Sequence, residues 1–348
     1  MKRVMALILA LTLFTVMFTG CTQKPAQEES KPEVNIESDK NEEEQKEEPK
    51  AVEPVSLKVS SPGGPLAISL VKMFKEKPSL GEKVEVSYEA VKSPDVMAAQ
   101  IIKGEVDFAV VPTNLAAKLH NKGVPYKLAA STVWGVLYIA SSEEVKGWEE
   151  LKGKEIYTIG RGLTPDILLR YLLTKNGLDP EKDVTIKYLA GPQELAGFMV
   201  TGKANIAVVP EPMLSAVLMK NKDVKVVLDM QKEWEKITGN SSYPQSSLIV
   251  KNEVIEKYPE VVENFLAKYE ESISWVNENP AEAGKYVEEL EIGLKAALAQ
   301  KAIPGSNLKY VEASEARSAI EEFLKVLVDF SAESIGGELP KDELYFQR

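Results

Sequence analysis

The sequence predicts an α/β protein built from two similar lobes, and three observations support this fold class. The phrase GEVDFAVVP at 104–112 returns as GKANIAVVP at 202–210, with the same glycine and the same Ala-Val-Val-Pro ending. Strand-like and helix-like segments alternate ahead of each copy, which is typical of lobes with parallel strands. The part that can fold begins near Val55 and spans about 290 residues, more than one core usually supports. An accidental likeness between two apolar strands is the alternative.

The first 20 residues have the pattern of an export signal. Lys2 and Arg3 precede an apolar run at 4–18, and Thr-Gly precedes Cys21, the only cysteine of the chain. The run is shorter than the roughly 20 residues of a membrane-spanning helix, so a secretory signal peptide is favoured. The segment resembles the lipobox of bacterial lipoproteins, although Phe18 departs from its usual leucine. An ordinary cleavage site is the alternative. Lipidation would consume the single thiol, so no disulfide framework is expected.

Residues 21–54 are predicted to form a disordered acidic spacer. Between Thr22 and Pro54, ten Glu and one Asp face five Lys, a net charge of −6, and large apolar side chains are almost absent. Such a composition buries too little surface to offset the entropy of ordering. The net charge of −11 for the whole chain argues against a nucleic-acid partner, which needs clustered Lys and Arg.

The elements of the first lobe follow in order from Val55. Residues 55–60 alternate like a half-buried strand, and Ser-Pro-Gly-Gly-Pro at 61–65 ends it. Its last proline suits the first position of a helix over 66–74. After the first copy of the phrase, Thr113 and Asn114 are expected to cap a helix beginning near Leu115. Further predicted elements are a strand at 83–88, a helix at 94–103 and a strand at 108–111.

The second lobe repeats this order. A strand at 155–159 leads into the turn Gly160-Arg161-Gly162-Leu163-Thr164 and a helix at 165–175. The two copies of the phrase are therefore expected to be equivalent strands of two similar lobes. The remaining predicted elements are a strand at 184–189, a helix at 192–201, a strand at 206–209 and a helix from Met213.

The chain then returns to the first lobe. A strand at 246–250 precedes a mostly helical remainder, in which 258–277 and 316–330 are strongly periodic. Crossings near 139–143 and 245–250 would make a two-stranded hinge. The expected domains are 55–140 with 248–348 as lobe 1, and 141–247 as lobe 2.

Several segments together resemble type II periplasmic binding proteins of ABC importers. They are SPGGPLA, GEVDFAVVPTNLA, GWEELKGKEIYTIGRG, GKANIAVVPEPMLSAVL and SLIVKNEVIEKYPEVVENFLAKY, and the likeness covers about residues 55–335. Within that family the chain is most similar to receptors for sulfonates, taurine, nitrate and thiamine-precursor pyrimidines. The motifs are not specific for one ligand.

The resemblance implies two mixed sheets with flanking helices, two crossover hinge segments and a solute-binding cleft. The implied function is an extracytoplasmic lipoprotein, held to the cell membrane through Cys21, that captures a small solute and delivers it to a separate permease. The chain is expected to act as a monomer without a cofactor or metal. No G-x-x-x-x-G-K-[ST] motif of an ATPase occurs in it.

Three loops are candidates for holding the solute, because ligands collect where parallel strands end and helices begin. Glycine lets the backbone approach a ligand closely, and free N–H groups at a helix start suit anions. Ordinary turn and capping chemistry is the alternative for each loop. The candidate residues in these loops are Gly63, Gly64 and Pro65, then Thr113 and Asn114, then Gly160, Arg161 and Thr164.

Four side chains suggest what kind of solute would bind. Arg161 can pair with a sulfonate, carboxylate or phosphate, or face solvent. Glu211 follows the repeated proline where the first copy has Thr113, and it can hold an amine or ring N–H donor, or merely favour a helix start. Trp134 and Tyr243 lie near the predicted crossings and can stack a flat ligand, or belong to the core. The set favours a heterocyclic or amine-bearing solute over a bare oxyanion.

An enzyme on the same fold, of the thiamine- or menaquinone-biosynthesis type, is the competing interpretation. The single histidine, His120, lies in a polar stretch typical of an exposed helix end. No Ser, His and Asp arrangement or HExxH spacing stands out. An export signal would also separate the protein from cytosolic cofactors, so no enzymatic activity is expected.

Overall fold

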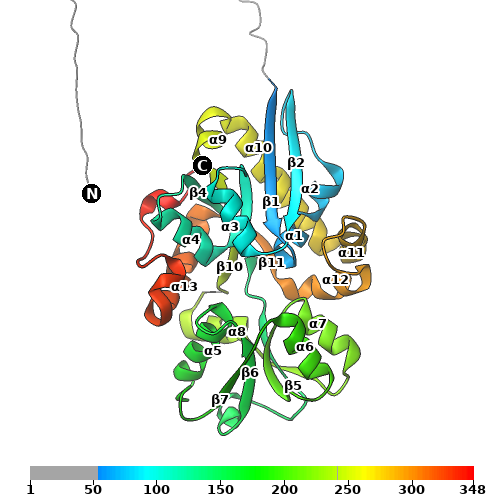
Figure 1. The fold of residues 1–348 in the computed structure, drawn as a ribbon, viewed down its shortest axis with the longest axis vertical. Coiled ribbons are helices and arrows are strands. Elements are labelled where there is room, and N and C mark those ends of the chain that lie inside the picture. Colours follow the sequence, from blue (N-terminus) through cyan, green and yellow to red (C-terminus); the bar gives the residue numbers. More distant parts are fainter. Residues whose placement is uncertain (1–53, 241) are drawn as a thin grey trace, which may run out of the picture. The chain divides into compact units, whose positions relative to one another are not determined.

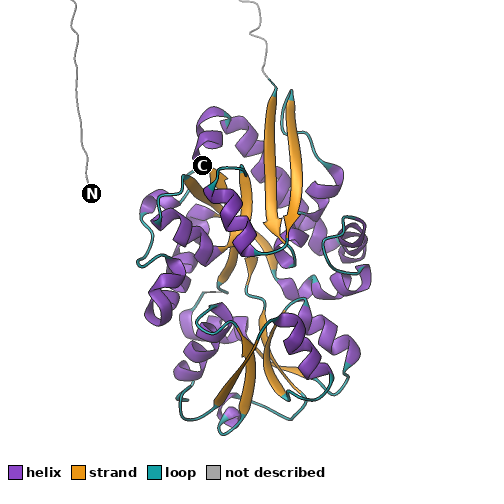
Figure 2. Cartoon of the chain, viewed as in Figure 1, coloured by secondary structure: helices purple, strands orange, loops and turns teal. Residues whose placement is uncertain are grey.

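The computed structural model describes residues 54–240 and 242–348, and it places their strands in two mixed β-sheets (Figure 1; Figure 2). This arrangement confirms the predicted α/β class with two mixed sheets and flanking helices. The predicted signal peptide at 1–20, the lipidation of Cys21 and all of the spacer at 21–54 except its last residue lie outside the described residues. Within the described part of the chain, no helix has the length and apolar character needed to cross a membrane.

The first sheet has six strands in the order β11-β4-β10-β3-β1-β2. Strands β2, β1 and β3 run parallel and are joined through helices, whereas β10 is antiparallel to both β3 and β4. The bounds are β1 Val55–Pro62, β2 Val84–Val91, β3 Phe108–Pro112, β4 Tyr126–Trp134, β10 Pro244–Lys251 and β11 Leu308–Glu312.

The second sheet has five strands in the order β7-β6-β8-β5-β9. Strands β7, β6 and β8 run parallel, and β5 is antiparallel to both β8 and β9. Apart from β11, which the first sheet has in addition at its edge, the order of parallel and antiparallel neighbours is therefore the same in the two sheets. The bounds are β5 Leu137–Ser141, β6 Glu155–Ile159, β7 Thr185–Leu189, β8 Ile206–Pro210 and β9 Lys225–Asp229.

Helices cover both faces of each sheet (Figure 1). Apolar residues at helical spacing form the buried face of the long helices, as in α10, where Val262, Phe265 and Tyr269 are buried. The helices around the first sheet are α1 Pro65–Ser69, α2 Val71–Glu76, α3 Pro94–Ile102, α4 Thr113–Asn121, α9 Asn252–Lys257, α10 Pro259–Glu278, α11 Pro280–Glu289, α12 Ala296–Ala302 and α13 Ala313–Ser331, with short 3₁₀ turns η2 Pro304–Ser306, η3 Ala332–Ile335 and η4 Asp342–Leu344. Those around the second sheet are η1 Trp148–Leu151, α5 Thr164–Lys175, α6 Pro192–Val200, α7 Met213–Lys220 and α8 Met230–Thr238.

The two copies of the repeated phrase occupy equivalent strands, as predicted. Strand β3 lies between a parallel β1 and an antiparallel β10, and β8 lies between a parallel β6 and an antiparallel β5. Gly104 and Gly202 precede these strands with φ of 71° and 69°, a conformation that favours glycine. The carbonyl groups of Asp107 and Asn205 each accept a backbone N–H from the antiparallel neighbour's side, at 3.0 and 2.9 Å.

The chain crosses between the sheets at Gly135–Val136 and just ahead of Pro244, and the two crossings contact each other. The Gly135 N–H donates to the Tyr243 carbonyl over 2.9 Å, and the Asn307 side chain donates to the Gly135 carbonyl over 2.7 Å. Both crossings precede the predicted ones, because strand pairing begins earlier than the sequence pattern indicated. Residues 137–140 pair within the second sheet and 244–247 within the first, which differs from the predicted boundaries at 140 and 247.

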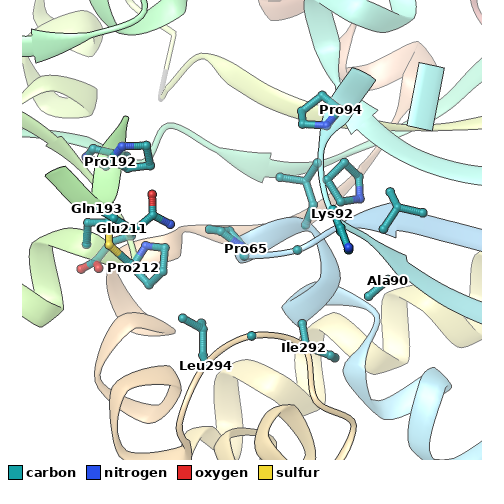
Figure 3. Close-up of a pocket in the computed structure, with 18 of the residues that line it drawn as sticks. Pro65, Ala90, Lys92, Pro94, Pro192, Gln193, Glu211, Pro212, Ile292 and Leu294 are labelled. Atoms are coloured by element: carbon teal, nitrogen blue, oxygen red, sulfur yellow. The ribbon is translucent and has the colours of Figure 1, made fainter. Parts of the chain in front are cut away.

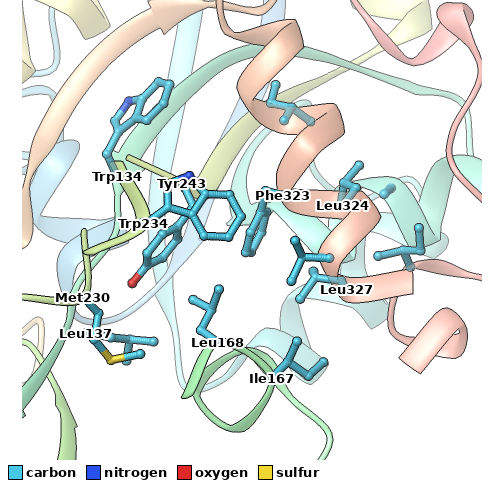
Figure 4. Close-up of a cluster of buried hydrophobic side chains, with 14 of the residues drawn as sticks. Trp134, Leu137, Ile167, Leu168, Met230, Trp234, Tyr243, Phe323, Leu324 and Leu327 are labelled. Carbon is cyan, nitrogen blue, oxygen red and sulfur yellow. The ribbon is translucent and has the colours of Figure 1, made fainter. Parts of the chain in front are cut away.

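One apolar cluster extends through residues of both sheets. Helix α13 packs against α5, and Phe323 of α13 lies near Trp234 of α8 and stacks on Tyr243 at 5.6 Å (Figure 4). Leu137 of β5 and Leu168 of α5 belong to the same cluster. The two sheets are therefore connected by a shared core as well as by the two crossings.

The last residues of the chain pack on the first sheet. Tyr345 is buried and forms a parallel bridge with Leu128, and the Phe346 N–H donates to the Leu128 carbonyl over 2.8 Å. Arg348 forms ion pairs with Glu263 and Glu312. This segment contributes to the fold.

Candidate functional site

The carboxyl ends of parallel strands from both sheets border one cavity of about 560 Å³ (Figure 3). A cavity of this volume is within the range of sites for small ligands, and its place at the strand ends is where α/β proteins bind them. The lining comes from the ends of β1, β2, β3, β7 and β8, together with the loop after α11. Its residues are Pro62, Gly63, Gly64, Pro65, Leu66, Ala90, Val91, Lys92, Pro94, Pro112, Pro192, Gln193, Pro210, Glu211, Pro212, Met213, Glu291, Ile292, Gly293 and Leu294.

Prolines at repeat-equivalent positions form much of the rim. Pro94 and Pro192 are the first residues of α3 and α6, where a proline costs no helical hydrogen bond. Pro112 and Pro210 end the two copies of the repeated phrase. Because each ring fixes its own backbone angle, these residues give the cavity rigid apolar corners.

The charged lining side chains stand where the two repeats differ. The strand registers make Lys92 equivalent to Ala190, and Glu211 occupies the position of Thr113. Lys92 therefore comes from the half with the first sheet and Glu211 from the half with the second. Among the described lining residues, Glu291 is the third charged side chain.

Glu211 is 6% exposed and is held from its own helix. Its Oε1 accepts the Ser215 hydroxyl over 2.9 Å and its Oε2 accepts the Ser215 N–H over 3.1 Å. A methyl group on Gly305 would lie only 2.6 Å from Oε1, so the carboxyl packs directly against that backbone. Burial raises the pKa of the Glu211 carboxyl to about 7, opposed by the Ser215 donors and the charge of Lys301.

Four of the predicted site residues line the cavity, namely Gly63, Gly64, Pro65 and Glu211. Gly64 has φ of 79°, so glycine is needed for the chain to turn from β1 into α1 at the cavity wall. The Gly-Gly signal and the comparison of the repeats therefore led to residues of the cavity wall, and their binding role stays a prediction.

Thr113 and Asn114 do not line the cavity. Thr113 is fully buried as the first residue of α4, and its hydroxyl is hydrogen bonded to Ser247 of β10 at 2.9 Å instead of capping the helix. The Asn114 amide donates to the Ser334 carbonyl over 3.4 Å. Both side chains therefore stabilise the first sheet and its helices.

Trp134 and Tyr243 belong to the core, in contrast to the predicted stacking role (Figure 4). Tyr243 is fully buried and its hydroxyl donates to Gln231 over 2.7 Å. Trp134 is 7% exposed and its indole N–H donates to the Lys309 carbonyl over 3.0 Å. Their predicted positions beside the crossings are correct, but neither residue lines the cavity.

The loop with Gly160, Arg161 and Thr164 follows β6, which lies between β7 and β8 in the second sheet. The connections after β7 and β8 border the cavity, but this loop does not. The Arg161 guanidinium lies over the Tyr188 ring at 4.2 Å, a cation–π contact. Asp166 fixes the loop by accepting the Gly162 N–H over 2.8 Å.

Sequence reasoning missed Lys92, Gln193 and the loop at 291–294. An alignment of the two repeats would have pointed to Pro94 and Pro192, which follow equivalent strands, but not to Gln193, whose equivalent Asp95 does not line the cavity. Nothing in the sequence distinguishes Lys92 from other surface lysines. Within the described residues, no group of His, Cys, Asp and Glu could hold a metal ion.

Comparison with known protein families gives one match over most of the folded part. Residues 81–283 match the family model described as NMT1/THI5 like. No curated protein sequence matches the chain.

Solved structures of similar fold include ABC transporter components. A structure titled as an ABC transporter from Parabacteroides distasonis has a TM-score of 0.74 at 29% identity, covering 84% of this chain and 99% of that one. The periplasmic aliphatic sulphonate binding protein SsuA from Escherichia coli gives 0.66 at 16% identity over 85% and 93% of the two chains. The periplasmic nitrate-binding protein NrtA from Synechocystis PCC 6803 gives 0.54 at 16% over 81% and 84%.

Proposed function

Because this chain belongs to the NMT1/THI5-like family, we propose that it is the solute-binding component of an ABC importer. It captures a small solute in the cavity at the strand ends and delivers the solute to a membrane permease. The observation that carries the proposal is the cavity of about 560 Å³ bordered by equivalent strand ends of two related sheets. The structural neighbours named as ABC transporter, sulphonate-binding and nitrate-binding proteins support it.

Capture works through a shift of population. The lining comes from both sheets, so a solute makes its full set of contacts only when the two halves lie together around it. Its greater affinity for that arrangement supplies the bias toward the closed form. The permease then distinguishes the loaded from the empty receptor.

We propose that each of the two moving halves consists of one sheet and the helices around it. The first lobe comprises 55–136 and 244–348, and the second comprises 137–243; pairing of β5 and β10 supports these limits. We further propose that the protein is a monomer outside the cytoplasm and is tethered to the membrane through lipid on Cys21.

The transporter interpretation is favoured over the enzyme alternative. The structural neighbours named above are solute-binding transporter components. The lone histidine, His120, lies on α4 and does not line the cavity. Among the described lining residues there is no Ser, Thr, Cys or His to act as a nucleophile beside the Glu211 carboxyl.

Two measurements test the proposal. Mass spectrometry of solute released from the purified full chain identifies what the cavity holds, and thermal-shift assays across a metabolite panel find the class that stabilises it. We expect a rise of several degrees for one chemical class, since a ligand that binds only the folded state stabilises it. Turnover of a bound compound, or no stabilisation by any class, would contradict a receptor function.

A further inference from the structure

We infer that the captured solute carries an anionic group at one end and a hydrogen-bond donor at the other, the first bound by Lys92 and the second by Glu211. The inference rests on the proposed function and narrows its solute class. It comes from two of the three charged side chains in the lining, Lys92 from the half with the first sheet and Glu211 from the half with the second. The third, Glu291, is exposed on the loop after α11.

Lys92 is the positive side chain of the lining. It lies on the connection from β2 to α3 and forms no ion pair among the described residues (Figure 3). The equivalent position in the second repeat is Ala190, so the connection folds without a charge there. An ammonium group enclosed with a ligand loses water, and this loss is offset when the ligand supplies an anion.

Glu211 lines the cavity and has acceptor positions that Ser215 does not use. Ser215 uses one lone pair on each carboxyl oxygen, whereas an ionised carboxylate has about four such sites. Glu211 lines the cavity, and the remaining sites suit an amine or ring N–H. Because the group is buried, a donor that pairs with it stabilises the ionised form.

The wall between these groups is mostly apolar. Figure 3 draws Pro65 between Lys92 and Glu211, and Ile292 and Leu294 lie along the same wall. The middle of the solute therefore contacts rings and aliphatic side chains, and its charges lie at the ends. A solute with only the anion or only the donor would leave one of the two cavity groups without a partner, which costs binding energy.

The test is the binding of charge-matched probes to the full chain by thermal shift and titration calorimetry. Four sets of probes of similar size are compared: anions such as benzoate, cations such as benzylammonium, neutral compounds such as benzyl alcohol, and compounds with both an acid and a donor such as 4-(aminomethyl)benzoate. We expect the tightest binder in the last set. A tighter binder from another set overturns the inference and leaves the proposed function standing, whereas no binder in any set contradicts both.

Substitutions test which residue binds which end of the solute. We expect Lys92→Ala to weaken the tightest binder about tenfold or more, since a charge-assisted contact is lost, and to leave the affinity of its acid-free analogue unchanged. Glu211→Gln should weaken it similarly and spare the donor-free analogue. Lys225→Ala, an exposed lysine of β9 outside the lining, is the control. Unchanged affinity in Lys92→Ala overturns the inference, and so does increased affinity, which would show that Lys92 and Glu211 pair with each other.

Discussion

The two copies of the repeated phrase show which residues build the frame and which carry the chemistry. Both copies start with a glycine of positive φ, continue as a fully buried strand and end with a proline at the cavity. The next residue differs. Thr113 turns inward to Ser247 of the same sheet, whereas Glu211 reaches the cavity wall and the backbone of Gly305. The comparison shows that the identical prolines give the cavity its rim, whereas the position after them, which differs between the copies, places a charged side chain in the lining only in the second copy.

The largest loss of stability is expected from truncating buried side chains in the strands that the two copies form. Phe108 stacks on Phe265 at 4.0 Å, and Ile206 is buried at the same position of the second copy. We expect Phe108→Ala to lower the free energy of unfolding by about 3 to 5 kcal/mol and Ile206→Ala by about 2 to 5 kcal/mol. Urea denaturation checks both values. A near-neutral result at either site would mean that the two strands do not have the same structural role.

The next largest effect is a pH dependence of the free energy of unfolding, which is expected for a substitution at Glu211 but not for one at Thr113. The folded-state pKa of Glu211 is raised from 4.5 to about 7, so its neutral form favours folding below pH 4.5, and this contribution is lost as the pH rises through 7. Glu211→Gln should therefore be more stable than the parent at pH 8 by about 1 to 3 kcal/mol and similar to it at pH 4.5. Chemical denaturation at both pH values measures this.

Thr113→Val provides the matched control for that comparison. It removes the hydroxyl bonded to Ser247, and we expect a loss of about 1 kcal/mol that does not change between the two pH values. A pH-dependent loss at Thr113, or a pH-independent effect at Glu211, would remove the distinction between the two positions.

A smaller and equal effect is expected at the two glycines. Gly104→Ala and Gly202→Ala place a side chain in the left-handed region at φ of 71° and 69°, with no atom closer than 3.8 Å to the added carbon. Each should cost about 1 to 2 kcal/mol from backbone strain alone. Thermal unfolding of both variants tests the equivalence, and clearly unequal losses would contradict it.

The smallest effect is expected at Arg161. Its contact with Tyr188 is a cation–π pair, so Arg161→Ala should cost about 0.5 to 1 kcal/mol. Because Arg161 does not line the cavity, the affinity for the solute should change little, contrary to the sequence-based expectation. A large loss of affinity in titration calorimetry would show that this loop contacts the solute in the loaded protein.

The sequence predicted the strongly periodic elements and the repeat, but not every strand. The strands missed were Tyr126–Trp134, Leu137–Ser141, Lys225–Asp229 and Leu308–Glu312. They lack a clear alternation of apolar and polar residues, and their formation depends on partners distant in the chain. Of the residues that line the cavity, the glycines after β1 and the residue after the second proline were predicted from local rules. The inward direction of Tyr243 was not predictable, since position near a crossing does not specify which face a side chain covers.

The aromatic cluster around Tyr243, Trp234 and Phe323 limits how the molecule can move. Exposing any of these buried rings would cost about 1.5 to 3 kcal/mol, so motion that separates α13 from α5 and α8 is unfavourable. In the proposed closure, the cluster is therefore expected to be the pivot beside the paired crossings. A small rotation about it would displace the proline-lined rim most, so a slight repacking of rings would be enough to open or close the entry to the cavity.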